Sequence, residues 1–241
     1  LNKPVLSARA FVTGLGYYEM ELNGRKVGDE VLAPVKTDYD KTVTYTVHDI
    51  TGQLTQGENT VGIVLGTGWY NHFAQSAWDF DEAPWRSYPE MLCQLEVTYT
   101  DGTRQVIASD ESWTCSQGPI RYDGIRNGEH YDARLEMPGW STPIYNDSDW
   151  QPVVVVDGPK GQLTAQYLPP IQERMEIKPV SVTQVRPGVY VFDLGQNIAG
   201  YSRIRVAGPA GTEITLKHGE KLHPDGTVQQ TQILRFLKTG E

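Results

Sequence analysis

The chain has 241 residues, of which 39% are hydrophobic and 21% are charged, with 30 acidic against 21 basic side chains. A chain of this length and composition can bury a substantial core, as one large β domain or as two smaller ones. The acidic surplus disfavours a surface that binds nucleic acid or an anionic membrane. No apolar run approaches the roughly 20 residues that a membrane helix needs. These features predict a soluble globular protein.

The ends of the chain indicate that it belongs to a longer protein. Leu1 stands where an initiator Met would stand, and the segment after it lacks the features of a signal peptide. The polar sequence Lys-Thr-Gly-Glu at residues 238–241 is an equally arbitrary end. We therefore expect further sequence on both sides.

Short alternating segments predict strands along almost the whole chain. In residues 18–22, apolar side chains alternate with two glutamates, and Asn23-Gly24 then supplies a type I′ hairpin turn. The same period of two predicts strands over 43–48, 61–65 and 91–99. The last of these is expected to form a hairpin with 105–108 across an Asp-Gly turn. Further strands are expected at 153–156, 176–185, 189–194, 201–206 and 212–218. Without a convincing helix, this pattern predicts an all-β fold of two β-sandwich domains, of jelly-roll or galactose-binding-like type.

A turn-rich break divides the predicted sandwiches. Residues 157–161 read Asp-Gly-Pro-Lys-Gly, and Leu168-Pro169-Pro170 opens an extended stretch without periodicity. Two consecutive prolines cannot occupy a central strand, and they stiffen the backbone. We place one sandwich at residues 1–158 and a second, truncated one at residues 159–241.

The two cysteines are predicted to be buried and free. Cys93 alternates with apolar neighbours in the strand over 91–99, and Cys115 follows Trp113 in the next strand-like segment. A disulfide between adjacent strands is the alternative, but a core of this size needs no crosslink.

Common catalytic motifs are missing from the sequence. The five histidines are scattered, and neither His-Glu-x-x-His nor the paired-cysteine spacing of a zinc site occurs. No Gly-x-Ser-x-Gly elbow is present either. The glycine pairs at 14–16 and 66–68 lack the strand-to-helix context of a phosphate loop, so they are interpreted as turn glycines.

Two polar-aromatic motifs carry a family resemblance: Gly128-Glu-His-Tyr-Asp-Ala-Arg134 and Asp193-Leu-Gly-Gln-Asn-Ile-Ala-Gly200. They occur in order with further landmarks at residues 18–25, 37–39, 43–45, 66–70, 138–140, 147–150, 218–220 and 224–227. Together these motifs resemble the bacterial α-L-rhamnosidase family over nearly the whole chain. The compartment stays open between the bacterial cytoplasm, the periplasm and the exterior.

The resemblance implies a region without catalytic residues. Members of this family place several β-sandwich domains ahead of a large helical barrel, which holds the two carboxyl groups for inverting hydrolysis of terminal α-L-rhamnosides. Those groups are therefore expected beyond residue 241. The implied partners are glycans or glycosides containing L-rhamnose and the downstream barrel itself. A free-standing carbohydrate-binding module and a purely structural scaffold without a ligand stay open as alternatives.

The segment from residue 69 to residue 88 concentrates aromatic and short polar side chains between two predicted strands. Pyranose rings stack an apolar C–H face on an aromatic ring, and their hydroxyl groups need polar partners. The resulting candidates for substrate binding are Trp69, Tyr70, Asn71, Trp78, Asp79, Asp81, Trp85 and Arg86. The alternative is that these aromatic side chains pack the top of the core and fold the loop onto the sandwich.

A calcium site is a weaker hypothesis for the same loop. Some members of the family carry a calcium-dependent rhamnose-binding module, and calcium takes six to eight oxygen ligands. Asp79, Asp81 and Glu82 are the candidate ligands, although their spacing matches no EF-hand. A solvated acidic loop is the alternative, and no other cofactor is expected.

The two family motifs also have structural interpretations. Glu129, Asp132 and Arg134 are expected to form a hydrogen-bonded fork that ties loops together, because guanidinium presents a planar pair of donors to carboxylates. The alternative is an edge that faces an active site. In the second motif, Gln196 and Asn197 are expected to cap a turn at a strand end or to meet a neighbouring domain.

Overall fold

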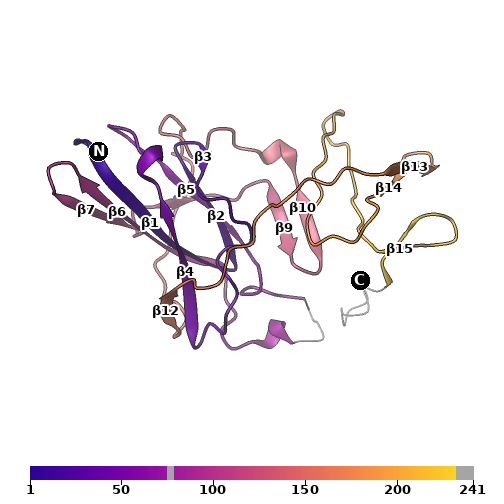
Figure 1. Ribbon diagram of the computed structural model, residues 1–241, viewed down its shortest axis with the longest axis horizontal. Helices are drawn as coiled ribbons and strands as arrows, with labels where there is room; N and C mark the ends of the chain where they lie inside the picture. The colour runs from indigo at the N-terminus through magenta and orange to yellow at the C-terminus, as the bar shows by residue number, and fades with distance from the viewer. Residues whose placement is uncertain (75–78, 232–241) are drawn as a thin grey trace. The chain divides into compact units, whose positions relative to one another are not determined.

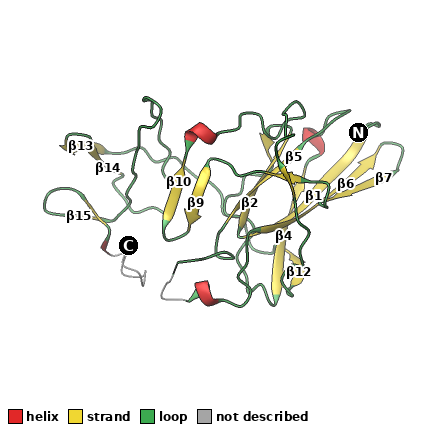
Figure 2. Cartoon of the chain, turned by 180° about the vertical axis from the view of Figure 1, so that it is seen from behind, coloured by secondary structure: helices red, strands yellow, loops and turns green. Residues whose placement is uncertain are grey.

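The structure is a computed structural model that describes residues 1–74 and 79–231. Its elements are β-strands and three short 3₁₀ turns, η1 (Thr51–Gln53), η2 (Phe80–Glu82) and η3 (Ala133–Leu135), as Figure 2 shows. The predicted all-β class is therefore confirmed. No helix within the described residues has the length and apolar character that crossing a bilayer requires.

Contacts divide the described chain into two compact units. Unit 1 holds Leu1–Phe73 and Phe80–Gln172, and unit 2 holds the remaining described residues. Each unit is described by itself.

Unit 1 contains two main sheets (Figure 1). The larger one has the strand order β12 (Gln162–Ala165), β4 (Thr42–Asp49), β1 (Val5–Leu15), β6 (Glu90–Tyr99) and β7 (Arg104–Ala108). The smaller one has the order β3 (Arg25–Lys26), β2 (Tyr17–Leu22) and β5 (Val61–Gly66). All of these pairs are antiparallel except β12 with β4.

The core of unit 1 lies between these two sheets. The alternation predicted for residues 18–22 holds, since Met20 and Leu22 of β2 are 1% and 0% exposed. They belong to one buried cluster with Val12 of β1 and Val97 of β6. Asn23 and Gly24 take positive φ values of 53° and 77°, as the hairpin turn between β2 and β3 requires.

Two further antiparallel pairs complete unit 1. β9 (Ile120–Gly124) pairs with β10 (Gly128–Tyr131), and β8 (Thr114–Cys115) pairs with β11 (Gln151–Pro152). The strand predicted over 153–156 is wrong, because these residues form no ladder and Val154 is 81% exposed.

Unit 1 continues past residue 158. The backbone of β12 pairs with the outer strand β4 in parallel register, from Gln162 opposite Thr42 to Ala165 opposite Tyr45. Residues 157–161 thus form a connection within unit 1, whose last residue is Gln172.

Unit 2 contains two hairpins among its described residues. β13 (Ser181–Arg186) pairs with β14 (Val189–Asp193), and β15 (Lys221–Leu222) pairs with β16 (Val228–Gln229). The strands predicted over 201–206 and 212–218 are wrong, since these residues are irregular and exposed. A strand forms only where a neighbouring strand pairs its backbone groups, and residues 201–206 and 212–218 have no such partner within the described residues.

The two cysteines are free, as predicted, but only one is buried. Cys93 lies in β6 at 1% exposure, and burial raises the pKa of its thiol to about 12. Cys115 is exposed, so its predicted burial is wrong. It lies on the two-residue strand β8, whose residues are both exposed.

Candidate functional site

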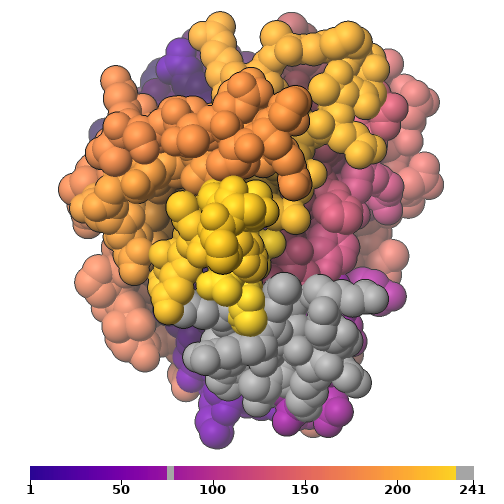
Figure 3. Space-filling view, turned by 90° about the vertical axis from the view of Figure 1, so that its right-hand side faces the viewer, coloured from indigo at the N-terminus to yellow at the C-terminus, as the bar shows by residue number. Residues whose placement is uncertain are grey.

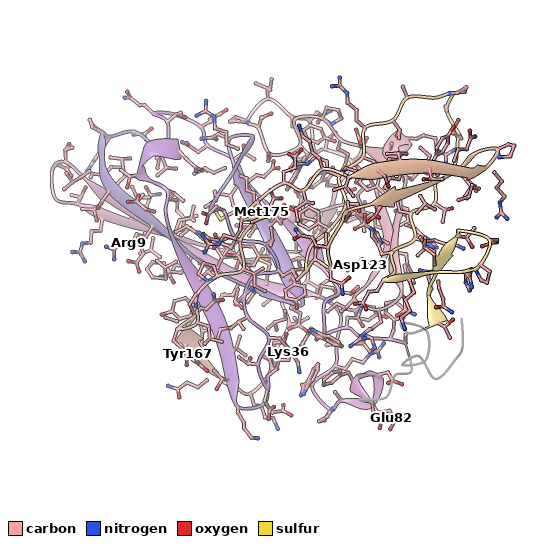
Figure 4. All side chains as sticks on the ribbon, turned by 45° about the vertical axis from the view of Figure 1, so that its right-hand side comes forward. Arg9, Lys36, Glu82, Asp123, Tyr167 and Met175 are labelled. Atoms are coloured by element: carbon pink, nitrogen blue, oxygen red, sulfur yellow. The ribbon has the colours of Figure 1, made fainter. Side chains whose placement is uncertain are left out.

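The connection between β5 and β6, residues 67–89, is termed the β5–β6 loop. Asp123 of β9, labelled in Figure 4, anchors its first residue. The backbone N–H of Thr67 donates to Asp123 Oδ2 at 2.8 Å, and the Thr67 hydroxyl donates to the same oxygen at 2.9 Å. Nearby, the rings of Phe73 and Tyr122 lie 5.2 Å apart in an edge-to-face arrangement. The hairpin β9–β10 therefore holds the start of the loop.

Tyr70 and Trp85 pack against the large sheet. Tyr70 is 3% exposed and forms a second buried cluster with Leu15, Tyr39 and Val43, against which Trp85 packs. The Tyr70 and Trp85 rings are stacked, with centroids 6.2 Å apart and planes at 11°. Burial raises the pKa of Tyr70 to about 12. These contacts favour the packing interpretation for these two side chains.

A second aromatic group in the loop, Trp69 and Phe80, is less buried, and the ammonium group of Lys36 lies over its rings. The Trp69 and Phe80 rings lie 5.0 Å apart, edge to face. The Lys36 ammonium group lies 4.2 Å from the Phe80 ring centroid and 5.9 Å from that of Trp69. All three side chains are half-buried, and Lys36 is labelled in Figure 4. This group therefore offers both aromatic surface and a hydrogen-bond donor.

The polar candidates of the loop differ in their partners. Arg86 Nε donates to the His72 carbonyl at 2.6 Å, which fixes the loop backbone. The Asn71 backbone N–H donates to the Thr67 carbonyl at 3.0 Å. Asp81 Oδ1 is shielded from solvent and accepts no hydrogen bond from the described residues. A buried carboxylate oxygen without a donor is costly, so a ligand hydroxyl would be favoured there.

Three candidates remain: Trp78, Asp79 and Glu82. Trp78 lies outside the described residues, and Asp79, with φ of 51°, belongs to unit 2. Glu82 is exposed at the end of η2 (Figure 4). Across residues 1–74 and 79–231, no three or more His, Cys, Asp or Glu side chains form a group that could hold a metal ion.

In the first family motif, the predicted carboxylate–guanidinium fork is confirmed for two of the three residues. Arg134 Nε and Nη2 donate to the two oxygens of Asp132 at 2.8 and 2.6 Å. These bonds hold the pKa of Asp132 at about 2. Because the pair spans only two residues, it shapes the η3 turn and does not tie separate loops. Glu129 lies opposite Asp123 in the β9–β10 ladder and is exposed.

The second motif forms a turn after β14 in unit 2. The Gly195 backbone N–H donates to Asp193 Oδ1 at 2.8 Å, and Gly195 has a φ of 72°. Asp193 therefore caps this turn, in place of the predicted Gln196 and Asn197.

Several residues of the site escaped the sequence analysis. Lys36 and Asp123 lie far from the loop in the sequence, and only tertiary contacts bring them to it. Phe80 lies in the loop but was not among the candidates. Tyr39 lies within a family landmark, which was the single signal for its segment.

Two family profiles together cover most of the chain. The profile described as Alpha-L-rhamnosidase N-terminal domain matches residues 3–175. The profile described as Bacterial alpha-L-rhamnosidase concanavalin-like domain matches residues 183–240. The chain therefore belongs to the α-L-rhamnosidase family, and the resemblance inferred from its motifs is confirmed.

Individual relatives show how much of a whole protein this chain represents. An α-L-rhamnosidase of Streptomyces avermitilis is 42% identical over 233 residues, which cover 96% of this chain and 22% of the relative. One from Formosa agariphila is 38% identical over 256 residues, which cover 100% of this chain and 27% of the relative. The chain thus spans about a quarter of the length of these curated relatives.

Solved structures share the fold. The crystal structure of Streptomyces avermitilis α-L-rhamnosidase complexed with L-rhamnose matches with a TM-score of 0.90 at 41% identity, covering 95% of this chain and 22% of that one. The structure of α-L-rhamnosidase from Dictyoglumus thermophilum matches with a TM-score of 0.84 at 35% identity, covering 95% and 25%.

Proposed function

We propose that this chain is the non-catalytic N-terminal region of an enzyme that hydrolyses terminal α-L-rhamnosides by inversion. Family membership and the share of the relatives that it spans support this assignment. The barrel that follows in the whole protein would hold the acid and the base, roughly 6.5–9.5 Å apart.

Six carboxyl groups of the described residues have a pKa shifted away from the direction that a general acid needs. A general acid needs a carboxyl group whose pKa is raised so that it stays protonated near neutral pH. In the described residues, hydrogen bonds from neighbouring side chains instead lower the pKa of six aspartates: Asp38, Asp49, Asp101, Asp110, Asp132 and Asp225.

We further propose that unit 1 contacts rhamnose-containing glycans through the β5–β6 loop. The observation that carries this proposal is Asp81 Oδ1, a shielded acceptor that no donor of the described residues reaches. Asp81 directly follows Phe80, whose ring is half-buried. The apolar face of a deoxysugar would stack on Trp69, and Asp81 and Lys36 would bond its hydroxyl groups.

Calorimetric titration with L-rhamnose tests the binding proposal, with and without added calcium. Heat of binding that Asp81→Asn abolishes supports the β5–β6 loop as the site. Heat that appears only with calcium adds a metal to the proposal. Tyr167→Ala serves as the control, because that ring is 75% exposed and lies outside the loop. Absence of heat under both conditions, for a chain with intact β-type circular dichroism, refutes sugar binding.

A scaffold that braces the barrel without binding a ligand is the second candidate function. The burial of Tyr70 and its stacking on Trp85 favour it, because these rings fix the loop on the sheet. Under this alternative, no substitution in the loop changes an affinity, and the same chain stabilises a separately expressed barrel domain.

A further inference from the structure

His48 of β4 lies in a buried polar cluster in unit 1 that the proposed function does not use. Its side chain is 7% exposed. The Nε2 atom lies 2.8 Å from the hydroxyl of Tyr18, 3.1 Å from that of Thr46 and 3.3 Å from Glu30 Oε1. One imidazole nitrogen thus meets a carboxylate and two hydroxyl groups in a site shielded from water.

The hydrogen bonds of this cluster have one consistent direction. The Thr46 hydroxyl donates to the Val12 carbonyl at 3.2 Å, and it contacts the Tyr18 hydroxyl. Tyr18 therefore donates to Thr46, and its oxygen is left to accept a bond. The Nε2–H of a neutral His48 can supply that bond and also face Glu30 Oε1. The network thus places a hydrogen on Nε2 of His48, and in the neutral ring Nδ1 then carries none.

Glu30 connects this cluster to the end of unit 1. It belongs to the loop at residues 28–33, termed the clasp loop, which holds residues 169–172, termed the linker. The Val31 backbone N–H donates to the Ile171 carbonyl at 2.9 Å. Gln172 Nε2 donates to Asp29 Oδ2 at 2.7 Å, and Glu30 forms a β-bridge with Gln172. Glu30 therefore contacts His48 with its side chain and the linker with its backbone.

The clasp loop lies directly against the imidazole ring. A Cβ atom added at Gly28, whose φ is 78°, would meet His48 Cε1 at 2.9 Å. The loop backbone can therefore approach the ring this closely only because residue 28 is a glycine.

Protonation of His48 is unfavourable while the cluster is closed. The groups that face it are Glu30 and Asp29 of the clasp loop and Tyr18 of β2, with Cys93 of β6 behind Tyr18. Burial raises the pKa of both Tyr18 and Cys93, so these two groups are neutral. Burial lowers the pKa of His48, and this effect outweighs the attraction of the two carboxylates. In an exposed histidine the pKa is about 6.5, so a proton favours any state that releases the ring.

We propose that His48 and Glu30 form an acid-sensitive latch, in which neutral His48 keeps the clasp loop closed on the linker and protonation of His48 opens it. Opening frees residues 169–172 and lengthens the connection that leads to unit 2. The chain stays anchored at Gln166 when the clasp loop opens. The Gln166 side chain accepts from the Val35 N–H at 2.9 Å, and the Gln166 backbone N–H donates to the Tyr45 carbonyl at 2.8 Å. These bonds do not involve the clasp loop.

Hydrogen exchange of the Val31 amide tests the latch, because this amide closes the clasp. Its protection factor, corrected for the intrinsic exchange rate, is measured from about pH 7.5 to about pH 5 by NMR. The opening constant should rise below about pH 6.5, by up to roughly tenfold per pH unit for one linked proton. The control is the Asn23 amide, which donates to the Thr60 carbonyl at 3.0 Å in the same unit. Its protection should stay constant.

Two variants separate the latch from general acid sensitivity. In His48→Gln, the protection of Val31 should lose its pH dependence, because the titrating group is gone. In Glu30→Gln, the protection of the Val31 amide should fall already at neutral pH. This variant tests the latch if His48→Gln does not fold. The latch is overturned if protection of Val31 is independent of pH in the unmodified chain, or if the Asn23 amide loses protection in parallel.

Discussion

Units 1 and 2 have similar alternating patterns of apolar residues, but these residues are buried in unit 1 and exposed in unit 2. In unit 1, the alternating apolar residues of β1, β2 and β6 lie between two sheets and reach near-zero exposure. In unit 2, comparable residues such as Phe192, Ile204 and Leu216 are 59%, 47% and 47% exposed. The described residues 173–231 of this unit are coloured orange to yellow in Figure 3. The comparison teaches that a period of two specifies which side chains share a face. A strand also needs a neighbour that pairs its backbone groups, and burial of that face needs a covering layer.

A matched pair of leucine substitutions gives the largest expected effect. Leu22→Ala in unit 1 should lower the free energy of unfolding by about 2–5 kcal/mol, because the residue is 0% exposed and leaves a cavity. Leu216→Ala in unit 2 should change it by less than about 0.5 kcal/mol, as for an exposed site. Urea denaturation of both variants measures the difference. Equal losses would mean that unit 2 has a core of similar quality.

Within unit 1, two tryptophans of the β5–β6 loop should separate packing from recognition. Trp85→Ala should cost about 1–3 kcal/mol of stability and leave rhamnose affinity intact, because its ring packs on Tyr39 and Tyr70. Trp69→Ala should weaken rhamnose binding by about 1–3 kcal/mol with a smaller loss of stability. Thermal denaturation and calorimetry on both variants decide the roles. An unchanged affinity in Trp69→Ala beside a lowered melting temperature removes that ring from the sugar site.

The pH dependence of unit 1 should contain a contribution from His48. Its pKa is lowered in the folded state, so its contribution to stability is fully present above the ordinary pKa of about 6.5. That contribution is lost as the pH falls from there toward the lowered value. The stability difference between the unmodified chain and His48→Gln should therefore shrink on acidification. A constant difference, in unfolding titrations across this range, would contradict the lowered pKa.

For catalysis, the expected effect of the chain is zero. The purified chain should not release the aglycone of an aryl α-L-rhamnoside above the uncatalysed rate, because neither unit is expected to hold the inverting acid and base. Turnover that co-purifies with the chain and disappears when one of its own carboxyl groups is changed to the amide would contradict the assignment. Asp81→Asn and Asp132→Asn are suitable variants for that measurement.

The sequence predicted well where local pattern and burial agree. Residues 18–22 and the following Asn23-Gly24 turn needed only alternation and turn chemistry, and both are present in β2 and β3. Residues 201–218 show where local pattern is insufficient. Their composition suits strands, but whether strands form depends on partners that no local pattern specifies.

The candidate site was predicted less completely than the fold. The aromatic content of residues 69–88 pointed to this loop as a candidate, but it could not separate Tyr70, which packs on Val43, from Trp69, which lies beside Lys36. That distinction depends on residues far away in the sequence. The local fork of Asp132 and Arg134 was predictable because its partners are two residues apart.

The parallel pairing of β12 with β4 has a consequence for how unit 1 can be isolated. β12 satisfies the backbone groups on the open side of β4, where unpaired N–H and C=O groups would otherwise be available to another molecule. A polypeptide ending at residue 158 would expose that side, next to the outward-facing Val47, which is 46% exposed. Such a product should self-associate through added strands, whereas one ending at residue 172 keeps its own protecting strand.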